Sequence, residues 1–155
     1  MKDRISLFVA TGCYIGMIPG MPGTYASVAT TAVFYLIYRI SFRILPELHL
    51  SALCLITAAG TFAAARASRI LGKEDPQVVV IDEVAGQLTA LLFLPIHWYN
   101  LVAGTVLFRL FDIWKPYPIR RLEPLENGVG IMADDLLAGI YANIILQLAN
   151  RLLPA

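Results

Sequence analysis

The sequence carries little charge for its length. Only 15% of its 155 residues are charged and 58% are hydrophobic, whereas soluble domains average about 25% and 45–50%. The length allows one domain, residues 1–155, and is too short for two ordinary ones. One domain of this size has too little interior to hide so much apolar surface, so we expect contact with a membrane. The alternative is an unusually apolar soluble bundle or an oligomer.

Basic surface, cysteine and histidine are also scarce. A net charge of +1 without a continuous basic stripe gives no reason to expect nucleic acid as a partner. The only cysteines, Cys13 and Cys54, lie in apolar stretches without CxxC spacing, so neither a disulfide framework nor a zinc site is expected. Neither cysteine opens a CxxxxxR motif, and no DxDx[TV] motif occurs. The sequence therefore shows no known signature of a phosphatase nucleophile, and covalent catalysis stays an open alternative.

What the sequence does contain is a series of apolar blocks separated by short polar hinges. Three Gly and two Pro in residues 16–24 argue against regular structure there. Residues 48–65 contain no charged side chain and are long enough to cross a membrane. Residues 78–81 have the composition of a strand, but a buried lead-in to a helix or an extended entry segment is an equal alternative. Helices are expected from Thr24 or Ser27 to about Arg43, from about Leu48 to Leu71, from Val84 to Trp114 with a break at 95–100, and from about Ala133 to Leu153.

This pattern predicts an all-α fold, a compact single-domain helical bundle whose strongly apolar helices are membrane-associated or membrane-embedded. Lys and Arg are concentrated in residues 66–73 and 109–121, and the break near Pro95 has none. By the positive-inside rule, the parts of the chain beside these basic segments would face the cytoplasm.

Acidic residues stand directly against apolar helices in three places: Asp82-Glu83, Asp112 and Asp134-Asp135. Buried carboxylates are costly unless they are paired or bind a cation, so three such clusters in one small domain predict a shared site. Oxygen-only ligands favour Mg²⁺ over zinc. Neighbouring helical residues diverge by about 100°, so one acid of each pair could ligate directly while the other holds a second ion or a water.

The alternative is that these acids cap helix N-termini, where negative charge is favourable. That explanation suits the two acidic pairs but not Asp112, which is expected late in its helix. Small residues follow each pair, Ala85 and Gly86 after the first and Ala138 and Gly139 after the second. Small residues let helices approach closely and would bring the carboxylates together.

Two features could bind phosphate. Arg109 lies three residues before Asp112 on the same helix face, and Lys115 follows at the helix end beside prolines. An intrahelical ion pair is the simplest interpretation of the first two; a phosphate-binding cation beside a metal ligand is the functional one. Pro22, Gly23 and Thr24 are expected to form a turn before a helix, where free backbone N–H groups, the hydroxyls of Thr24 and Ser27 and the helix dipole favour phosphate.

Four segments carry a resemblance to a known family. Residues 82–87 (DEVAGQ), 108–119 (FRLFDIWKPYPI) and 128–139 (GVGIMADDLLAG) resemble the three motifs of bacterial phosphatidylglycerophosphatase A. Residues 22–27 (PGTYAS) resemble its N-terminal Gly-Thr-x-Gly-Ser motif, with Ala26 where the family often has a second glycine. The resemblance implies an all-α, Mg²⁺-dependent enzyme that hydrolyses phosphatidylglycerophosphate to phosphatidylglycerol at the bacterial inner membrane, in phospholipid biosynthesis.

The predicted site residues fall into three overlapping groups. The metal ligands would be Asp82, Glu83, Asp112, Asp134 and Asp135, and the substrate phosphate would meet Gly23, Thr24, Ser27, Arg109 and Lys115. The five acids with Arg109 and Lys115 make up the predicted catalytic set. Two rival functions are a CDP-alcohol phosphotransferase, another phospholipid-processing enzyme whose spaced signature is absent, and a non-enzymatic membrane scaffold. An oligomer is compatible with either.

Overall fold

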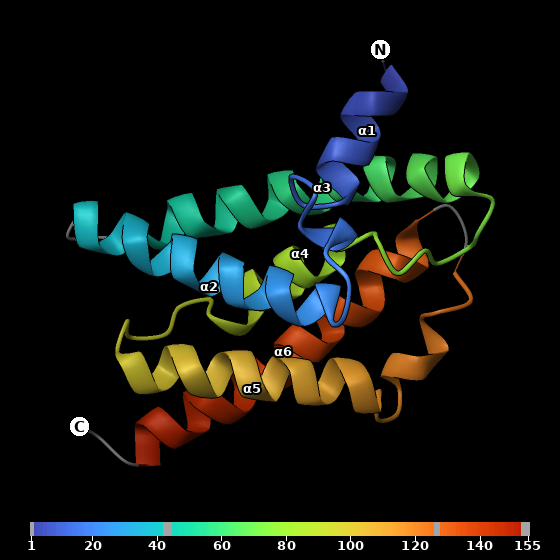
Figure 1. Ribbon diagram of the computed structural model, residues 1–155. Helices are drawn as coiled ribbons and strands as arrows, with labels where there is room; N and C mark the ends of the chain where they lie inside the picture. Colours follow the sequence, from blue (N-terminus) through green and yellow to red (C-terminus); the bar gives the residue numbers. More distant parts are fainter. Residues whose placement is uncertain (1, 42–44, 126–127, 153–155) are drawn as a thin grey trace.

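A computed structural model describes residues 2–41, 45–125 and 128–152 of the chain (Figure 1). In these ranges every regular element is helical, which confirms the predicted all-α fold class. The α-helices and two short 3₁₀ turns, in chain order, are α1 (Lys2–Ala10), η1 (Ile15–Met17), α2 (Pro22–Ser41), α3 (Pro46–Leu71), α4 (Ile81–Ala90), α5 (Trp98–Trp114), η2 (Ile119–Arg121) and α6 (Val129–Leu152).

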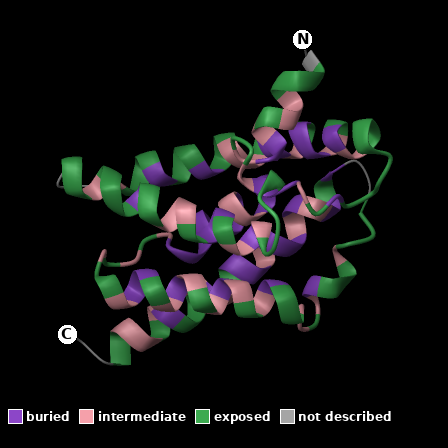
Figure 2. Ribbon diagram, viewed as in Figure 1, coloured by how far each residue is buried: buried purple, intermediate pink, exposed green. Residues whose placement is uncertain are grey.

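The short helix α4 lies at the centre of the bundle and packs against α2, α3, α5 and α6 (Figure 1). Nearly all of its residues are buried, Asp82 and Gln87 among them. Figure 2 shows the buried positions concentrated on this central layer and the exposed ones on the outer helices. A helix that is buried on every side places its polar groups inside the molecule, where each needs a partner.

Two glycines let α4 and α6 touch through their backbones. A Cβ atom on Gly139 would lie 2.3 Å from the carbonyl oxygen of Gly86, and one on Gly86 would lie 2.7 Å from the carbonyl oxygen of Asp135. No real Cβ atom tolerates either distance, so a side chain at these positions would push the helices apart. The small residues that follow the acidic pairs therefore act as expected, because they hold the two pairs close together.

Two helices, α3 and α6, are long and apolar enough to cross a membrane by length and composition. With 26 residues, α3 is roughly 39 Å long, more than the ~30 Å of a bilayer's hydrocarbon core. Large apolar side chains on its outer face are open to the surroundings, such as Leu55 at 70% and Phe62 at 79% exposure. Surfaces of this kind are suited to lipid or to another protein.

The structure decides between the alternatives expected for residues 78–81. Residues 78–80 are not a strand: Val78 lies in a turn, and Val79 and Val80 form a buried lead-in to α4, which begins at Ile81. The Val80 N–H donates to the carbonyl oxygen of Ala10 at 2.8 Å, and Val79 and Val80 are buried. These β-branched residues serve to bury the lead-in beneath the end of α1.

Several helix boundaries differ from the expected ones. Helix α2 begins at Pro22, so Thr24 and Ser27 lie inside it and are not N-caps; proline suits a first helical position because it lacks an N–H. Helix α6 begins at Val129, a full turn before Ala133, and α1 was not anticipated at all. The expected ends at Arg43 and Leu153 lie outside the described residues.

The α4–α6 contact yields a prediction about stability. Gly139→Ala should lower the free energy of unfolding by about 1–3 kcal/mol, the usual cost of overpacking, because the new methyl group meets backbone. Gly60→Ala is the matched control, since its methyl group would meet only the side chains of Ile81 and Met132, at 3.0–3.2 Å. Thermal unfolding in detergent measures both. Equal losses for the two variants would contradict the assigned role of the contact.

Candidate active site

Three carboxylates from two helices converge at the α4–α6 contact. Asp82 and Glu83 lie in the first turn of α4 and Asp135 lies on α6; one oxygen of each lies within 4.8 Å of the others. We call these three residues the carboxylate cluster. Asp82 and Asp135 are buried and Glu83 is partly buried. Oδ2 of Asp135 and Oε2 of Glu83 are enclosed without a hydrogen-bond partner.

The carboxylate cluster holds more negative charge than its neighbours balance. Burial, followed by repulsion from Glu83 and Asp135, raises the pKa of Asp82 well above its usual range. Burial also raises the pKa of Glu83, although a hydrogen bond to Asp82 and the charge of Arg109 oppose the rise. Two enclosed, unpartnered oxygens among three close carboxylates fit a divalent cation, and an all-oxygen donor set suits Mg²⁺.

Arg109 stands beside the carboxylate cluster and pairs with two acids. It donates a short hydrogen bond to Oδ2 of Asp112 one turn along α5, and its Nη1 lies 3.5 Å from Oε1 of Glu83. The intrahelical pair anticipated as the simplest interpretation therefore exists, and Arg109 also reaches across to α4. Its Nε is buried without a partner and remains able to donate.

Lys115 pairs with Asp134, the neighbour of Asp135 in the sequence. It ends α5 in a left-handed conformation with φ 47°, and its Nζ lies 2.6 Å from Oδ2 of Asp134 and 2.7 Å from Oε1 of Glu123. Burial lowers the pKa of Lys115, but the hydrogen bonds to these two carboxylates outweigh that effect and raise it above the ordinary value. Lys115 is therefore a firmly held, permanently charged cation.

Only one of the two acidic pairs divides as expected, with one acid in the carboxylate cluster and the other outside it. In the second pair, Asp135 joins the carboxylate cluster while Asp134 turns to Lys115. In the first pair, both Asp82 and Glu83 join it. The Asp82 side chain also accepts the Glu83 N–H at 3.0 Å, which keeps its carboxylate against the start of α4.

Helix capping does not explain the positions of all three groups of acids. Asp82 and Glu83 do lie in a first turn, where the helix dipole favours them. Asp134 and Asp135 lie beyond the first turn of α6, and Asp112 lies in the last turn of α5, where the dipole is unfavourable. The expectation that the second pair is placed to cap a helix is therefore wrong.

The beginning of α2 abuts the carboxylate cluster. A Cβ on Gly23 would lie 2.0 Å from Oε1 of Glu83 and 2.8 Å from Nη1 of Arg109, so a side chain there would displace these two charged groups. Thr24 is partly exposed, whereas Ser27 is buried and its hydroxyl donates to the carbonyl oxygen of Gly23 at 2.8 Å. Ala26 is buried within the helix and has no positive φ, so its place does not require glycine's backbone freedom.

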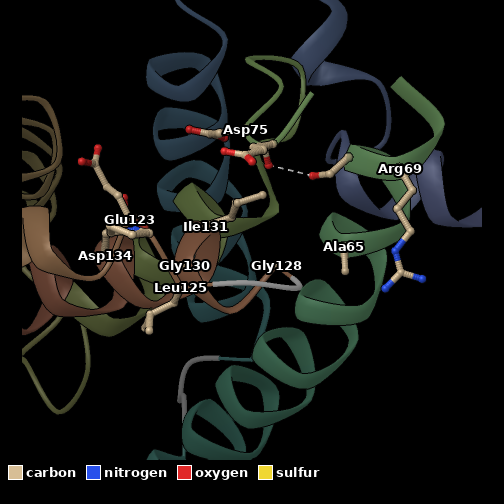
Figure 3. A pocket seen from close by; sticks show the side chains of 12 residues that line it. Ala65, Arg69, Asp75, Glu123, Leu125, Gly128, Gly130, Ile131 and Asp134 are labelled. Carbon is tan, nitrogen blue, oxygen red and sulfur yellow. Dashed lines mark hydrogen bonds between the residues drawn. The ribbon is translucent and has the colours of Figure 1, made fainter. Parts of the chain in front are cut away.

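A cavity of about 650 Å³ opens beside Lys115 and Asp134 (Figure 3). Asp75, Glu123 and Asp134 line one side, and Ala65 and Arg69 of α3 line the other. Burial raises the pKa of Asp75, and the charge of Lys115 partly opposes this.

Sequence reasoning missed two of these acids, Asp75 and Glu123. Both lie in polar loops rather than against apolar helices, so the pattern that revealed the other acids could not reveal them. Their neighbours Pro76 and Pro124 indicated only turns.

Comparison with known proteins places this chain among the phosphoric monoester hydrolases. The family Phosphatidylglycerophosphatase A is matched over residues 8–150, and the chain belongs to it.

Three relatives cover most of the chain. Phosphatidylglycerophosphatase A of Haemophilus influenzae is 38% identical over 89% of this chain and 84% of its own. The Escherichia coli protein of that name is 32% identical over 99% and 91%. A Bacteroides thetaiotaomicron protein provisionally named phosphatidylinositol-3-phosphatase is 35% identical over 94% of each. No solved structure matches the chain.

The crowding of the carboxylate cluster leads to a prediction. Asp135→Asn removes one of three close negative charges, so without metal the variant should unfold at a higher temperature than the wild type. Mg²⁺ at about 100 times its dissociation constant should stabilise the wild type by about 2.7 kcal/mol and the variant far less. Thermal unfolding with Mg²⁺ or EDTA measures both effects.

Asp3→Asn is the control, because Asp3 pairs with Arg66 on the surface, away from the cluster. It should keep the full response to Mg²⁺. An undiminished response in Asp135→Asn would show that the metal binds elsewhere.

Proposed function

We propose that this protein is a Mg²⁺-dependent lipid phosphatase that hydrolyses phosphatidylglycerophosphate to phosphatidylglycerol and phosphate in phospholipid biosynthesis. The observation that carries the proposal is the carboxylate cluster itself, which lies against the N-terminus of α2 and beside Arg109. The names of the Haemophilus and Escherichia relatives support this substrate. The Bacteroides relative makes a phosphorylated inositol lipid the second candidate.

The metal would be held by Asp82, Glu83 and Asp135. Bound Mg²⁺ would supply positive charge to stabilise the phosphoryl group and activate water. Asp112 and Asp134, also predicted as ligands, are each engaged by a cation, so we assign them the positioning of Arg109 and Lys115. They would ligate only if a second ion were bound.

The remaining groups would bind and orient the substrate phosphate. Arg109 stabilises the charge that develops on the phosphoryl oxygens, through donors that its bond to Asp112 leaves free. The N–H groups of Gly23 and Thr24 open α2 and point toward an anion at its N-terminus. Ser27 steadies this turn through the Gly23 carbonyl. Lys115, held by Asp134 and Glu123, would add a second positive charge for the phosphate.

The reaction is a hydrolysis at phosphorus. The oxygen of a water forms a bond to phosphorus while the bond from phosphorus to the ester oxygen of the lipid breaks. One proton of the water then passes to the departing alcohol, and inorganic phosphate is the other product. The proposed reaction has no covalent intermediate, in keeping with the absence of the two phosphatase nucleophile motifs from the sequence.

We place the protein in the bacterial inner membrane with its active site toward the cytoplasm. Two helices of sufficient length and the exposed apolar faces of the bundle support the membrane location. Arg120 and Arg121 are exposed on η2, close in sequence to Lys115, and basic residues flank the cytoplasmic ends of membrane helices.

The proposal predicts metal-dependent phosphate release from phosphatidylglycerophosphate by the protein in detergent, and none in EDTA. Asp82→Asn and Arg109→Gln should each lower kcat at least about 100-fold, the typical cost of losing one preorganised charge partner in an active site. Arg66→Gln, at the exposed pair with Asp3, is the control and should keep full activity.

Phosphatidylinositol 3-phosphate tested in parallel distinguishes the two substrate candidates. No metal-dependent release from either lipid by folded protein would overturn the enzymatic proposal in favour of a scaffold. Full activity of Asp82→Asn would overturn the assignment of the site.

A further inference from the structure

A second cavity, of about 600 Å³, forms an apolar groove between α2 and α3 with α4 as its floor. Both α2 and α3 pack on α4, yet within the described residues their backbones barely approach each other. We call this cavity the α2–α3 groove. Its walls include Ala29, Val33 and Ile37 of α2 and Leu48, Ala52 and Ile56 of α3.

Two polar side chains in the middle of the groove, Thr30 and His49, already bond to the protein. The hydroxyl of Thr30 donates to the carbonyl oxygen of Ala26 at 2.8 Å. Nε2 of His49 lies 3.0 Å from the carbonyl oxygen of Leu88, and its ring packs on Phe34. These walls therefore leave little for a polar ligand to bind and favour hydrocarbon.

One end of the groove adjoins the active site. Ala26, which lines the groove, lies one turn after Gly23, which contacts the site. On α4, the groove residues Ile81 and Val84 stand directly before and after Asp82 and Glu83. From Ala26 to Ser41 the groove follows α2 for roughly 22 Å at the helical rise of 1.5 Å per residue. One leaflet of a bilayer holds hydrocarbon to a depth of only about 15 Å. The groove is long enough for a phospholipid acyl chain.

We propose that the α2–α3 groove binds one acyl chain of the lipid substrate while its phosphate lies at the carboxylate cluster. This rests on the proposed lipid phosphatase function and adds how the enzyme would recognise the apolar part of its substrate. A charged site and an apolar groove are continuous at the same turn of α2, and a phospholipid carries a charged part and an apolar part in one molecule. The kcat/KM of the enzyme would then depend on the length of the lipid's acyl chains.

The first test compares a groove variant with a matched control. Ala29→Trp fills the groove, whereas Ala32→Trp places the same side chain at an exposed position of the same helix that does not line it. Phosphate release is measured from phosphatidylglycerophosphate with long (dioleoyl) and short (dihexanoyl) chains.

Ala29→Trp should lower the long-chain to short-chain ratio of kcat/KM about tenfold or more, the factor that corresponds to two methylenes returned to water. Ala32→Trp should leave the ratio unchanged. Ala52→Trp, which lines the groove from an exposed position of α3, repeats the test if Ala29→Trp does not fold. An unchanged ratio in a folded groove variant would overturn the proposal.

The second test does not depend on catalysis. Wild-type protein in nanodiscs is irradiated with phosphatidylglycerol that carries a diazirine in one acyl chain, and labelled residues are located by mass spectrometry. Groove residues such as Ile37 should be labelled, and unlabelled phosphatidylglycerophosphate should compete with that labelling. Labelling of Leu55 and Phe62, on the outer face of α3, should not be competed.

The two tests separate the two proposals. Competed labelling without any phosphate release would support the groove and contradict the lipid phosphatase. Phosphate release with groove labelling that is not competed would mean that bulk lipid fills the groove. Cross-links between protomers at the groove would mean that a second copy of the chain covers it. Either of these last two results would overturn the inference.

Discussion

The whole site depends on the backbone contact between α4 and α6. Gly86 and Gly139 let the two helices meet without intervening side chains, and this closeness brings Asp82 and Glu83 to Asp135. Close carboxylates repel one another, and burial makes the repulsion stronger because water cannot screen it. The packing of the core therefore holds together charges that would otherwise separate, and the free energy of a bound cation can offset that cost.

Arg109 and Lys115 balance part of the negative charge of the site's carboxylates but not all of it. Arg109 is engaged by Asp112 and approaches Glu83, while Lys115 is engaged by Asp134 and Glu123. Neither is paired with Asp82 or Asp135. An excess of negative charge remains at the carboxylate cluster. Arg109 lies beside it, and Lys115 is held by Asp134, the neighbour of Asp135 in the sequence. A divalent cation and a phosphate are together the ligands that such a pattern of charge complements.

Much of this arrangement could be predicted from the sequence because the signal was local. Uncharged runs indicated apolar helices, and acids that stand against such runs are unusual enough to indicate a site. Three-dimensional relations were less accessible. The start of α6 at Val129, four residues earlier than expected, changes Asp134 and Asp135 from capping positions to interior ones. Residues around Gly128 and Gly130 resembled a loop because glycine normally opposes a helix.

Other spatial relations had no signal in the sequence. Asp75 and Glu123 reach the site from loops, and only the folded chain shows that they adjoin Lys115. The turn of Gly23 was expected to bind phosphate, but the close approach of Glu83 and Arg109 to it appears only in the packed structure. The α2–α3 groove likewise depends on how two helices pack on a third, which hydrophobic pattern alone does not determine.

The central claim is that Asp82, Glu83 and Asp135 form the metal site. Anomalous diffraction from crystals grown with Mn²⁺, a substitute for Mg²⁺ with the same preference for oxygen ligands, tests this most directly. The account predicts an anomalous peak between α4 and α6, within coordination distance of all three carboxylates. A peak elsewhere, for instance in the cavity lined by Asp75, Glu123 and Asp134, with none at the cluster, would contradict it.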